Sequence, residues 1–368
     1  MADRRKFKQA QECARGASAG VDRKIEELGR HAAKLDVTLT RIQDLFERIG
    51  GKPEEYEEAY KQIKASHVNW KSAAEKVEKE YDKLGVSTKS GTAVAAAGIG
   101  LATLGPTAAM GVATTFGVAS TGTAISALSG AAATNAALAW LGGGVLAAGG
   151  GGMAAGKALL LLAGPVGWSV AAGAFVASIC FYFWEKSKLD RLMEIFTLIC
   201  RRDFKTSNLA VVELNERIWR IDDENEKLKD AIIEIETFGT NFNQMTREQQ
   251  MKLGAYVNLM RASMALLTNP ILGLQPKFSV RDFDKVYFDK VYKDEPGEIR
   301  RYFTCNKDVI IKLANLLFNI TLNGDDIELL AEHFKKDKEF LDSINMTEKT
   351  FDVKMIYMAV CCLEWQHA

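Results

Sequence analysis

Apolar side chains recur along the first ninety residues with the spacing of a heptad repeat. One stripe begins at Val21 and ends at Ile49 in alternating steps of four and three residues, and a second begins at Tyr56 and ends at Leu84 in the same steps. Such steps place all members of a stripe on one face of an α-helix. Glycine and proline within residues 50–53 separate the two helices, because neither residue continues a helix well. The pattern predicts that residues 1–90 form an antiparallel coiled-coil hairpin.

A third heptad stripe begins at Val211 and ends at Ile235, with Asn225 as its only polar member. A shorter amphipathic run precedes it, and we expect residues 185–240 to form the long helix that completes an elongated bundle with the hairpin. Four further apolar-periodic segments are separated by turn residues. They cover residues 253–267, 309–318, 327–334 and 353–365. Residues 241–368 are therefore predicted to form a compact helical domain, and the predicted fold class is all-α.

Between these polar parts lies an apolar insert, residues 91–184. Its 94 residues include no acidic side chain and no arginine, and Lys157 is its only charged residue. Nineteen of the 30 glycines of the chain fall within it, together with many Ala, Ser and Thr residues. In water each interior glycine costs a helix about 1 kcal/mol relative to alanine, whereas in a bilayer small residues let helices approach closely. The sequence thus predicts a long Gly/Ala-rich helical segment that inserts into a membrane.

Three stretches of the insert are long enough to cross a bilayer, residues 94–118, 123–147 and 158–184. Aromatic residues end the third stretch and the basic residues Lys186, Lys188 and Arg191 follow it, which is typical of a membrane interface. Basic residues also precede the insert, and this favours an even number of crossings. We therefore expect the second and third stretches to cross and the first to be re-entrant, interfacial or packed within the assembly. Three crossings are the alternative.

The residues expected to shape insertion are of two kinds. Some are glycines or a proline where helices approach or break, and others are aromatic or charged residues suited to an interface. They are Gly105, Gly111, Gly117, Trp140, Gly142, Gly152, Gly156, Lys157, Gly164, Pro165, Trp168, Phe181, Tyr182 and Trp184.

Charge and cysteine content limit the partners and the compartment. The chain has 47 Lys and Arg residues against 47 Asp and Glu residues, and neither polar part carries the basic field that nucleic-acid binding needs. Six scattered cysteines favour a reducing compartment. The basic N-terminus is not followed by an apolar segment, so we expect no ordinary secretory signal. We expect a membrane-associated protein that is synthesised in the cytoplasm, with secretion by another route left open.

We expect no enzyme, no cofactor and no metal site, because no catalytic motif stands out. The segment from Gly151 to Lys157 matches part of a phosphate-binding loop, but alanine follows it where Ser or Thr would hold magnesium. His67 lies on the second heptad stripe, which favours a packed and hydrogen-bonded side chain, with proton sensing as the alternative. Glu332 and His333 lie on an amphipathic segment, and we expect a solvated face there.

Long heptad helices at 21–49, 56–84 and 211–235 flank a single Gly/Ala-rich insert, and this organisation resembles α-helical pore-forming toxins of the cytolysin A and haemolysin BL type. The resemblance is one of organisation and involves no residue-level motif. It implies a helical protein that changes from a soluble form to an oligomeric membrane form. The insert also resembles, at residues 129–135, 139–144 and 164–168, a glycine-rich hydrophobic module of uncharacterised bacterial proteins that implies no established activity.

Two functional hypotheses follow from this organisation. The first is a protein that shelters its insert in a soluble form, then oligomerises and permeabilises a bilayer, as a pore-forming toxin or a membrane-disrupting effector does. Its partners would be the lipid bilayer and further copies of the chain, with or without a second protein component. The alternative is a constitutive membrane-anchored coiled-coil scaffold that binds partner proteins. Exposed apolar surface costs about 25 cal/mol per Å² in water, so recovery of the protein without detergent separates the two hypotheses.

Overall fold

A computed structural model describes residues 2–83 and 186–366, apart from residues 270, 275–276, 279–296, 338–339, 342–343 and 345. The regular elements in these ranges are α-helices and short 3₁₀ turns. The predicted all-α fold class is therefore confirmed for the part of the chain that the structure describes.

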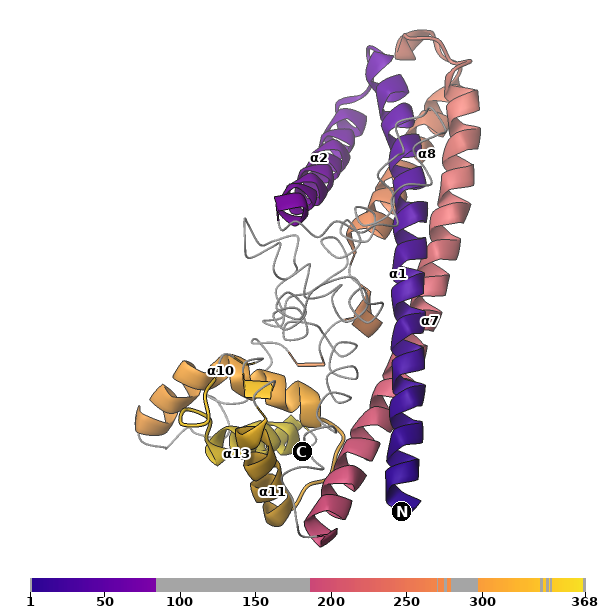
Figure 1. Cartoon of the computed structure of the whole chain (residues 1–368). Helices are drawn as coiled ribbons and strands as arrows, with labels where there is room; N and C mark the ends of the chain where they lie inside the picture. Colours follow the sequence, from indigo (N-terminus) through magenta and orange to yellow (C-terminus); the bar gives the residue numbers. More distant parts are fainter. Residues whose placement is uncertain are drawn as a thin grey trace.

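Two long helices, α1 (Ala2–Arg48) and α7 (Lys186–Ile235), lie side by side (Figure 1). They have 47 and 50 residues, so each is about 70 to 75 Å long. The helices are parallel, because His31 bonds to Asp222 at 2.5 Å and, further along both helices, Arg41 bonds to Glu236 at 2.7 Å. Helix α7 therefore begins at the end of the molecule where α1 begins.

The two long helices pack through the predicted apolar stripes. Every member of the stripe from Val21 to Ile49 is at most 5% exposed, and the members from Leu214 to Ile235 are at most 7% exposed. Asn225 is buried among them, as its position in the stripe predicted. Each large apolar side chain that is fully buried contributes about 1.5 to 3 kcal/mol. These stripes therefore hold together two helices whose outer faces are mostly polar.

Helix α1 extends further than its heptad stripe predicted, whereas α7 lies within the range of 185–240 that the sequence predicted for one long helix. Helix α1 begins at Ala2, and its buried stripe continues through Phe7, Ala10 and Ala14. Helix α7 is continuous, so the amphipathic run at 189–199 and the heptad stripe belong to one helix. The added length packs against helices from the end of the chain. The heptad pattern of α1 and α7 does not predict this packing, because the packing involves helices from the end of the chain.

Glycines turn the chain at the upper end of both long helices, as Figure 1 is drawn. Gly51 and Gly239 adopt φ angles of 72° and 77°, which residues with a side chain rarely adopt. The two turns are bonded to each other. The Gly50 N–H donates to the Thr240 carbonyl at 2.8 Å, and the Phe242 N–H donates to the Gly50 carbonyl at 2.9 Å.

Two shorter helices return from these turns. They are α2 (Glu54–Lys83), which follows α1, and α8 (Arg247–Thr268), which follows the 3₁₀ turn η3 (Phe242–Gln244). Helix α8 is antiparallel to α7. Tyr256 in the first half of α8 donates to Glu234 near the end of α7, whereas Arg217 of α7 donates at 2.7 Å to the Leu266 carbonyl near the end of α8.

Helix α2 folds back beside the last part of α1. Tyr60 lies against Phe46 with ring centroids 4.7 Å apart, and His67 is bonded to Gln43 at 2.9 Å and to Asp36 at 2.6 Å. The predicted hydrogen-bonded role of His67 is confirmed. These contacts are antiparallel, as a hairpin requires, but α1 packs along its whole length on α7. The reason is length, since the 30-residue α2 is much shorter than α1, whereas α7 matches it.

The described helices share two apolar cores. The upper core joins the upper parts of α1 and α7 to α2, to α8 and to the 3₁₀ turn η4 (Leu272–Leu274). The lower core joins the first turns of α1 and α7 to α10 (Gly297–Leu317), α11 (Gly324–Lys336) and α13 (Val353–Gln366). Residues 241–274 therefore pack with the long helices, while the later helices form the compact part of the predicted C-terminal domain.

Gly254 allows α8 and α2 to approach each other closely. A Cβ atom at this position would overlap the Tyr56 hydroxyl oxygen and would lie 2.7 Å from the Tyr56 Cζ atom. We expect Gly254→Ala to lower the free energy of unfolding by about 1 to 3 kcal/mol, because the rigid ring must move. Gly16→Ala is the control, since no atom lies within 4 Å of its Cβ position and alanine favours a helix by up to about 1 kcal/mol. Urea unfolding followed by circular dichroism measures both variants, and an unchanged Gly254→Ala midpoint would contradict the close packing.

Candidate functional site

The residues singled out in the apolar insert, from Gly105 to Trp184, lie outside the described residues. Their roles in crossing and packing stay predictions. Among the helices that the structure describes, none is long and apolar enough to span a membrane. The structure does describe the place where the chain leaves the insert, at the first turns of α7. Charged side chains of α7 and α11 meet there, and this junction is the candidate functional site.

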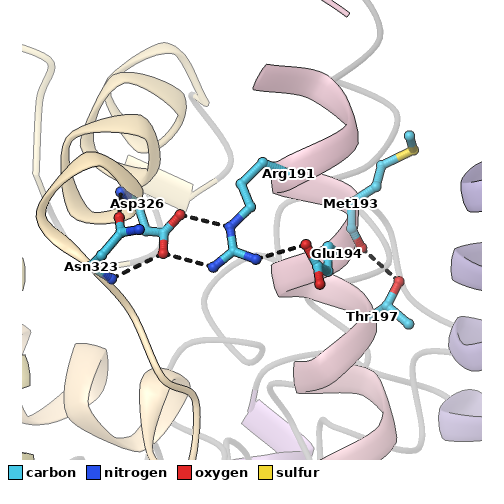
Figure 2. Close-up of polar contacts among 6 residues, drawn as sticks. All are labelled: Arg191, Met193, Glu194, Thr197, Asn323 and Asp326. Atoms are coloured by element: carbon cyan, nitrogen blue, oxygen red, sulfur yellow. Dashed lines mark hydrogen bonds and ion pairs between the residues drawn. The ribbon is translucent and has the colours of Figure 1, made fainter. Parts of the chain in front are cut away.

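Arg191, in the second turn of α7, forms a bidentate ion pair with Asp326 of α11. Its Nε donates to Oδ1 and its Nη2 donates to Oδ2, both at 2.8 Å, while its Nη1 donates to Glu194 at 2.7 Å (Figure 2). Two parallel bonds fix the orientation of the partners as well as their distance. The Arg191–Asp326 pair, hereafter the junction pair, therefore ties the beginning of α7 to α11 close to the end of the insert.

The carboxylate of Asp326 is positioned by the start of its own helix. The side chain of Asn323 caps α11 by accepting from the Asp326 N–H at 2.8 Å, and Asp326 accepts in return from the Asn323 N–H at 3.0 Å. Only 4% of the Asp326 side chain is exposed. The hydrogen bonds from Arg191 lower the pKa of Asp326 and outweigh the raising effect of burial. The carboxylate is therefore charged at neutral pH, and the helix N-terminus favours that charge.

A second ion pair joins the same two helices. Lys188 of α7 lies 3.8 Å from Glu332 of α11, and Glu332 also accepts from Lys336 at 2.8 Å. Glu332 is partly exposed, as expected. The hydrogen bond from Lys336 is the main cause that lowers the pKa of Glu332, and the charge of Lys188 lowers it by a smaller amount. Two of the basic residues expected at a membrane interface, Lys188 and Arg191, thus contact carboxylates of α11 in this structure.

A third link holds α7 to the end of α10. Arg202 donates to the carbonyl oxygens of Leu316 at 2.8 Å and Phe318 at 2.7 Å, and also to Asp203 at 2.7 Å. A cation is favourable at this position because the last carbonyls of a helix carry partial negative charge. Asp203 is 1% exposed, and burial raises its pKa although Arg202 opposes the rise. This link lies about three turns beyond the junction pair along α7 and reinforces it.

His333 does not lie on a solvated face, and that expectation was wrong. The side chain is 1% exposed, with its ring centroid 5.7 Å from that of Phe196 and 5.8 Å from that of Phe334. Helix α11 packs against both α7 and α13, so more of its surface is buried than the amphipathic pattern indicates. Burial lowers the pKa of His333 to about 4, although the charge of Asp337 acts in the opposite direction. The imidazole is therefore neutral at pH 7.

We also searched the described residues for a metal site. Within them, no group of three or more His, Cys, Asp or Glu side chains could hold a metal ion. Comparisons with protein-family models, with curated proteins and with solved structures find no match. The function has to be inferred from the organisation of the chain and from this junction.

Sequence reasoning missed the junction pair because its members lie 135 residues apart. Asn323 and Asp326 have the side chains of a capping box, a signal that locates the start of α11. That signal does not identify Arg191 as the partner, since the choice depends on how α11 packs on α7.

Proposed function

We propose that this chain is a membrane-inserting α-helical protein that oligomerises and permeabilises a lipid bilayer. The proposal rests on one observation, the 94-residue insert with a single charged residue between two strongly polar helices. A segment of this kind is unfavourable in water unless other parts of the protein cover it, and it is favourable in lipid. The glycine content is a further support, because small residues promote close packing of helices in a bilayer.

The described helices are suited to a change from a soluble form to a membrane form. We propose that α1 and α7 act as a coiled coil, since their heptad positions are buried against each other along the pair. The first turns of α7 are held mainly by ion pairs to α11 and by the lower core. Loss of those contacts would free the end of the insert while the upper core stays folded, because separate regions of a protein can open separately.

Release of a trapped dye from lipid vesicles tests the proposal. We expect the purified chain to be recovered without detergent and to release the dye. Gly152→Leu with Gly156→Leu should reduce the release strongly while the helical circular dichroism signal is kept, because the larger side chains prevent close helix packing. Full release by that variant would reject the packing role of the two glycines.

A second variant tests the folding of the body. Leu28 and Leu39 are both 0% exposed, so replacing both by aspartate should place charge in the buried stripe and cause loss of helical signal. If the folded wild-type chain releases no dye at any pH or lipid composition, the permeabilising function is wrong. A chain that also requires detergent from synthesis onward would fit the membrane-anchored scaffold instead.

A further inference from the structure

Charge is distributed unevenly along the two long helices. At the lower end, residues 2–16 of α1 contain five basic and two acidic residues. At the upper end, residues 213–235 of α7 contain eight acidic and four basic residues. Because the helices are parallel, their first turns lie at the same end of the molecule (Figure 1). The pair is thus basic at the lower end and acidic at the upper end, although the net charge of the whole chain is zero.

The basic side chains at the lower end are exposed to solvent. We call the following group the basal surface: Arg4, Arg5, Lys8 and Arg15 of α1, and Leu198, Arg201, Phe204, Lys205 and Leu209 of α7. Its apolar members are 38%, 38% and 66% exposed, in the order Leu198, Phe204, Leu209. Four acidic residues lie among residues 4–16 of α1 and 186–210 of α7. Glu12 is exposed, Asp190 is half-buried, Glu194 is bonded to Arg191, and Asp203 is buried and bonded to Arg202.

The two helices contribute to the basal surface at the same level. Arg15 is close enough to α7 to act on the thiol of Cys200, whose pKa burial raises to about 12 and the charge of Arg15 partly lowers. The parallel packing also places Gly20 of α1 beside Val211 of α7. The basic residues of both helices are therefore part of one end, and the insert joins α7 at that end.

We infer that the basal surface docks the protein on a bilayer of anionic lipids, an inference that rests on the proposed membrane function. Exposed Lys and Arg side chains complement phosphate headgroups, and each one near such a surface strengthens binding about fivefold. Exposed Leu and Phe side chains among them suit the boundary between headgroups and acyl chains. Docking in this orientation brings the junction between α7 and the insert to the lipid surface, and it keeps the acidic upper end away from it.

A duplex nucleic acid is the competing anionic partner, and the surface favours lipid over it. Nucleic-acid binding gains little from exposed leucine and phenylalanine, and it would suffer from the acidic upper half of the same helices. The apolar side chains and the adjoining insert are both accommodated by a bilayer.

Vesicle flotation of the full chain tests the inference. The probes are vesicles of phosphatidylcholine alone and vesicles in which about one third of the lipid is phosphatidylglycerol, a fraction that gives a strongly negative surface. The test variant carries Arg5→Gln, Lys8→Gln, Arg201→Gln and Lys205→Gln. The control carries Arg48→Gln, Lys61→Gln, Lys229→Gln and Arg247→Gln, which remove the same charge from exposed positions at the upper end.

We expect the wild type and the control to bind the anionic vesicles, and the test variant to bind them about tenfold or more weakly. Binding should also weaken as salt concentration rises, a measurement that needs no variant. Equal binding by the test variant, equal binding to neutral vesicles, or binding to duplex DNA without binding to vesicles would each overturn the inference. Dye release measured in parallel separates the two proposals. Salt-sensitive binding without release contradicts permeabilisation alone, and release that is unaffected in the test variant contradicts basal docking alone.

Discussion

At pH 4.5 the lower core is expected to be about 2 to 3 kcal/mol less stable than at pH 7 through His333 alone. The side chain is buried against Phe196 and Phe334, and burial lowers its pKa from the ordinary 6.5 to about 4. The unfolded chain therefore binds a proton below pH 6.5 that the folded chain does not bind until near pH 4. Stability is lost as the pH falls through this window and changes little more through His333 below it.

His333→Leu should remove this part of the pH dependence, because leucine fills similar space and does not titrate. Hydrogen exchange of the α11 amides at pH 7 and pH 4.5, corrected for the intrinsic effect of pH on exchange, measures the local stability. His31→Gln is the control, since His31 of α1 contacts Asp222 of α7, away from α11. If the corrected pH dependence of α11 is the same in the wild type and in His333→Leu, the burial of a neutral imidazole is not what destabilises the lower core in acid.

Asp326→Asn is expected to destabilise the contact between α7 and α11 by about 1 to 3 kcal/mol. The variant keeps an oxygen that can accept from the Asn323 N–H, but it removes the charge that pairs with Arg191. The lower end of that range allows for solvent, since 36% of the Arg191 side chain is exposed. Hydrogen exchange should increase in the first turns of α7 and in α11, while the α8 amides in the upper core stay protected.

The same variant links the junction to the proposed function. If the junction pair restrains the end of the insert, Asp326→Asn should release dye at a lower protein-to-lipid ratio than the wild type. Glu216→Gln is the matched control, because it removes a carboxylate of α7 from an exposed pair with Arg220 that is worth about 0.5 kcal/mol or less. Faster α7 exchange without easier release would show that the pair is structural and does not control insertion.

The two effects belong to different pH ranges. Because the pKa of Asp326 is lowered below its ordinary 3.8, the stabilisation from its carboxylate is present above that value and is lost only as the pH falls further. The His333 effect is already developed at pH 4.5. Mild acid should therefore weaken the lower core first and leave the junction pair charged.

Periodicity was a strong guide to the helices that it covered. The stripe from Val21 to Ile49 predicted one buried face of α1, and Asn225 and His67 are buried where their stripes placed them. Periodicity was less informative about partners. It indicated that α1 and α2 pack together, but α7 supplies the longer matching face, and α8 joins the upper core although it follows α7 in the chain. Equivalent apolar stripes do not specify which helix packs against them, so the pairing of helices depends on their lengths and on the turns that connect them.

The basic start of α1, the acidic second half of α7, the apolar insert and the all-helical character follow from the sequence by itself, because hydropathy, charge and helix periodicity are local properties of the chain. Tertiary structure alone decided that α1 and α7 are parallel, that Arg191 contacts Asp326, and that His333 is buried. Each of these facts depends on residues that are far apart in the chain and are brought together only when several helix faces pack at once. The junction beside the insert is such a product of packing.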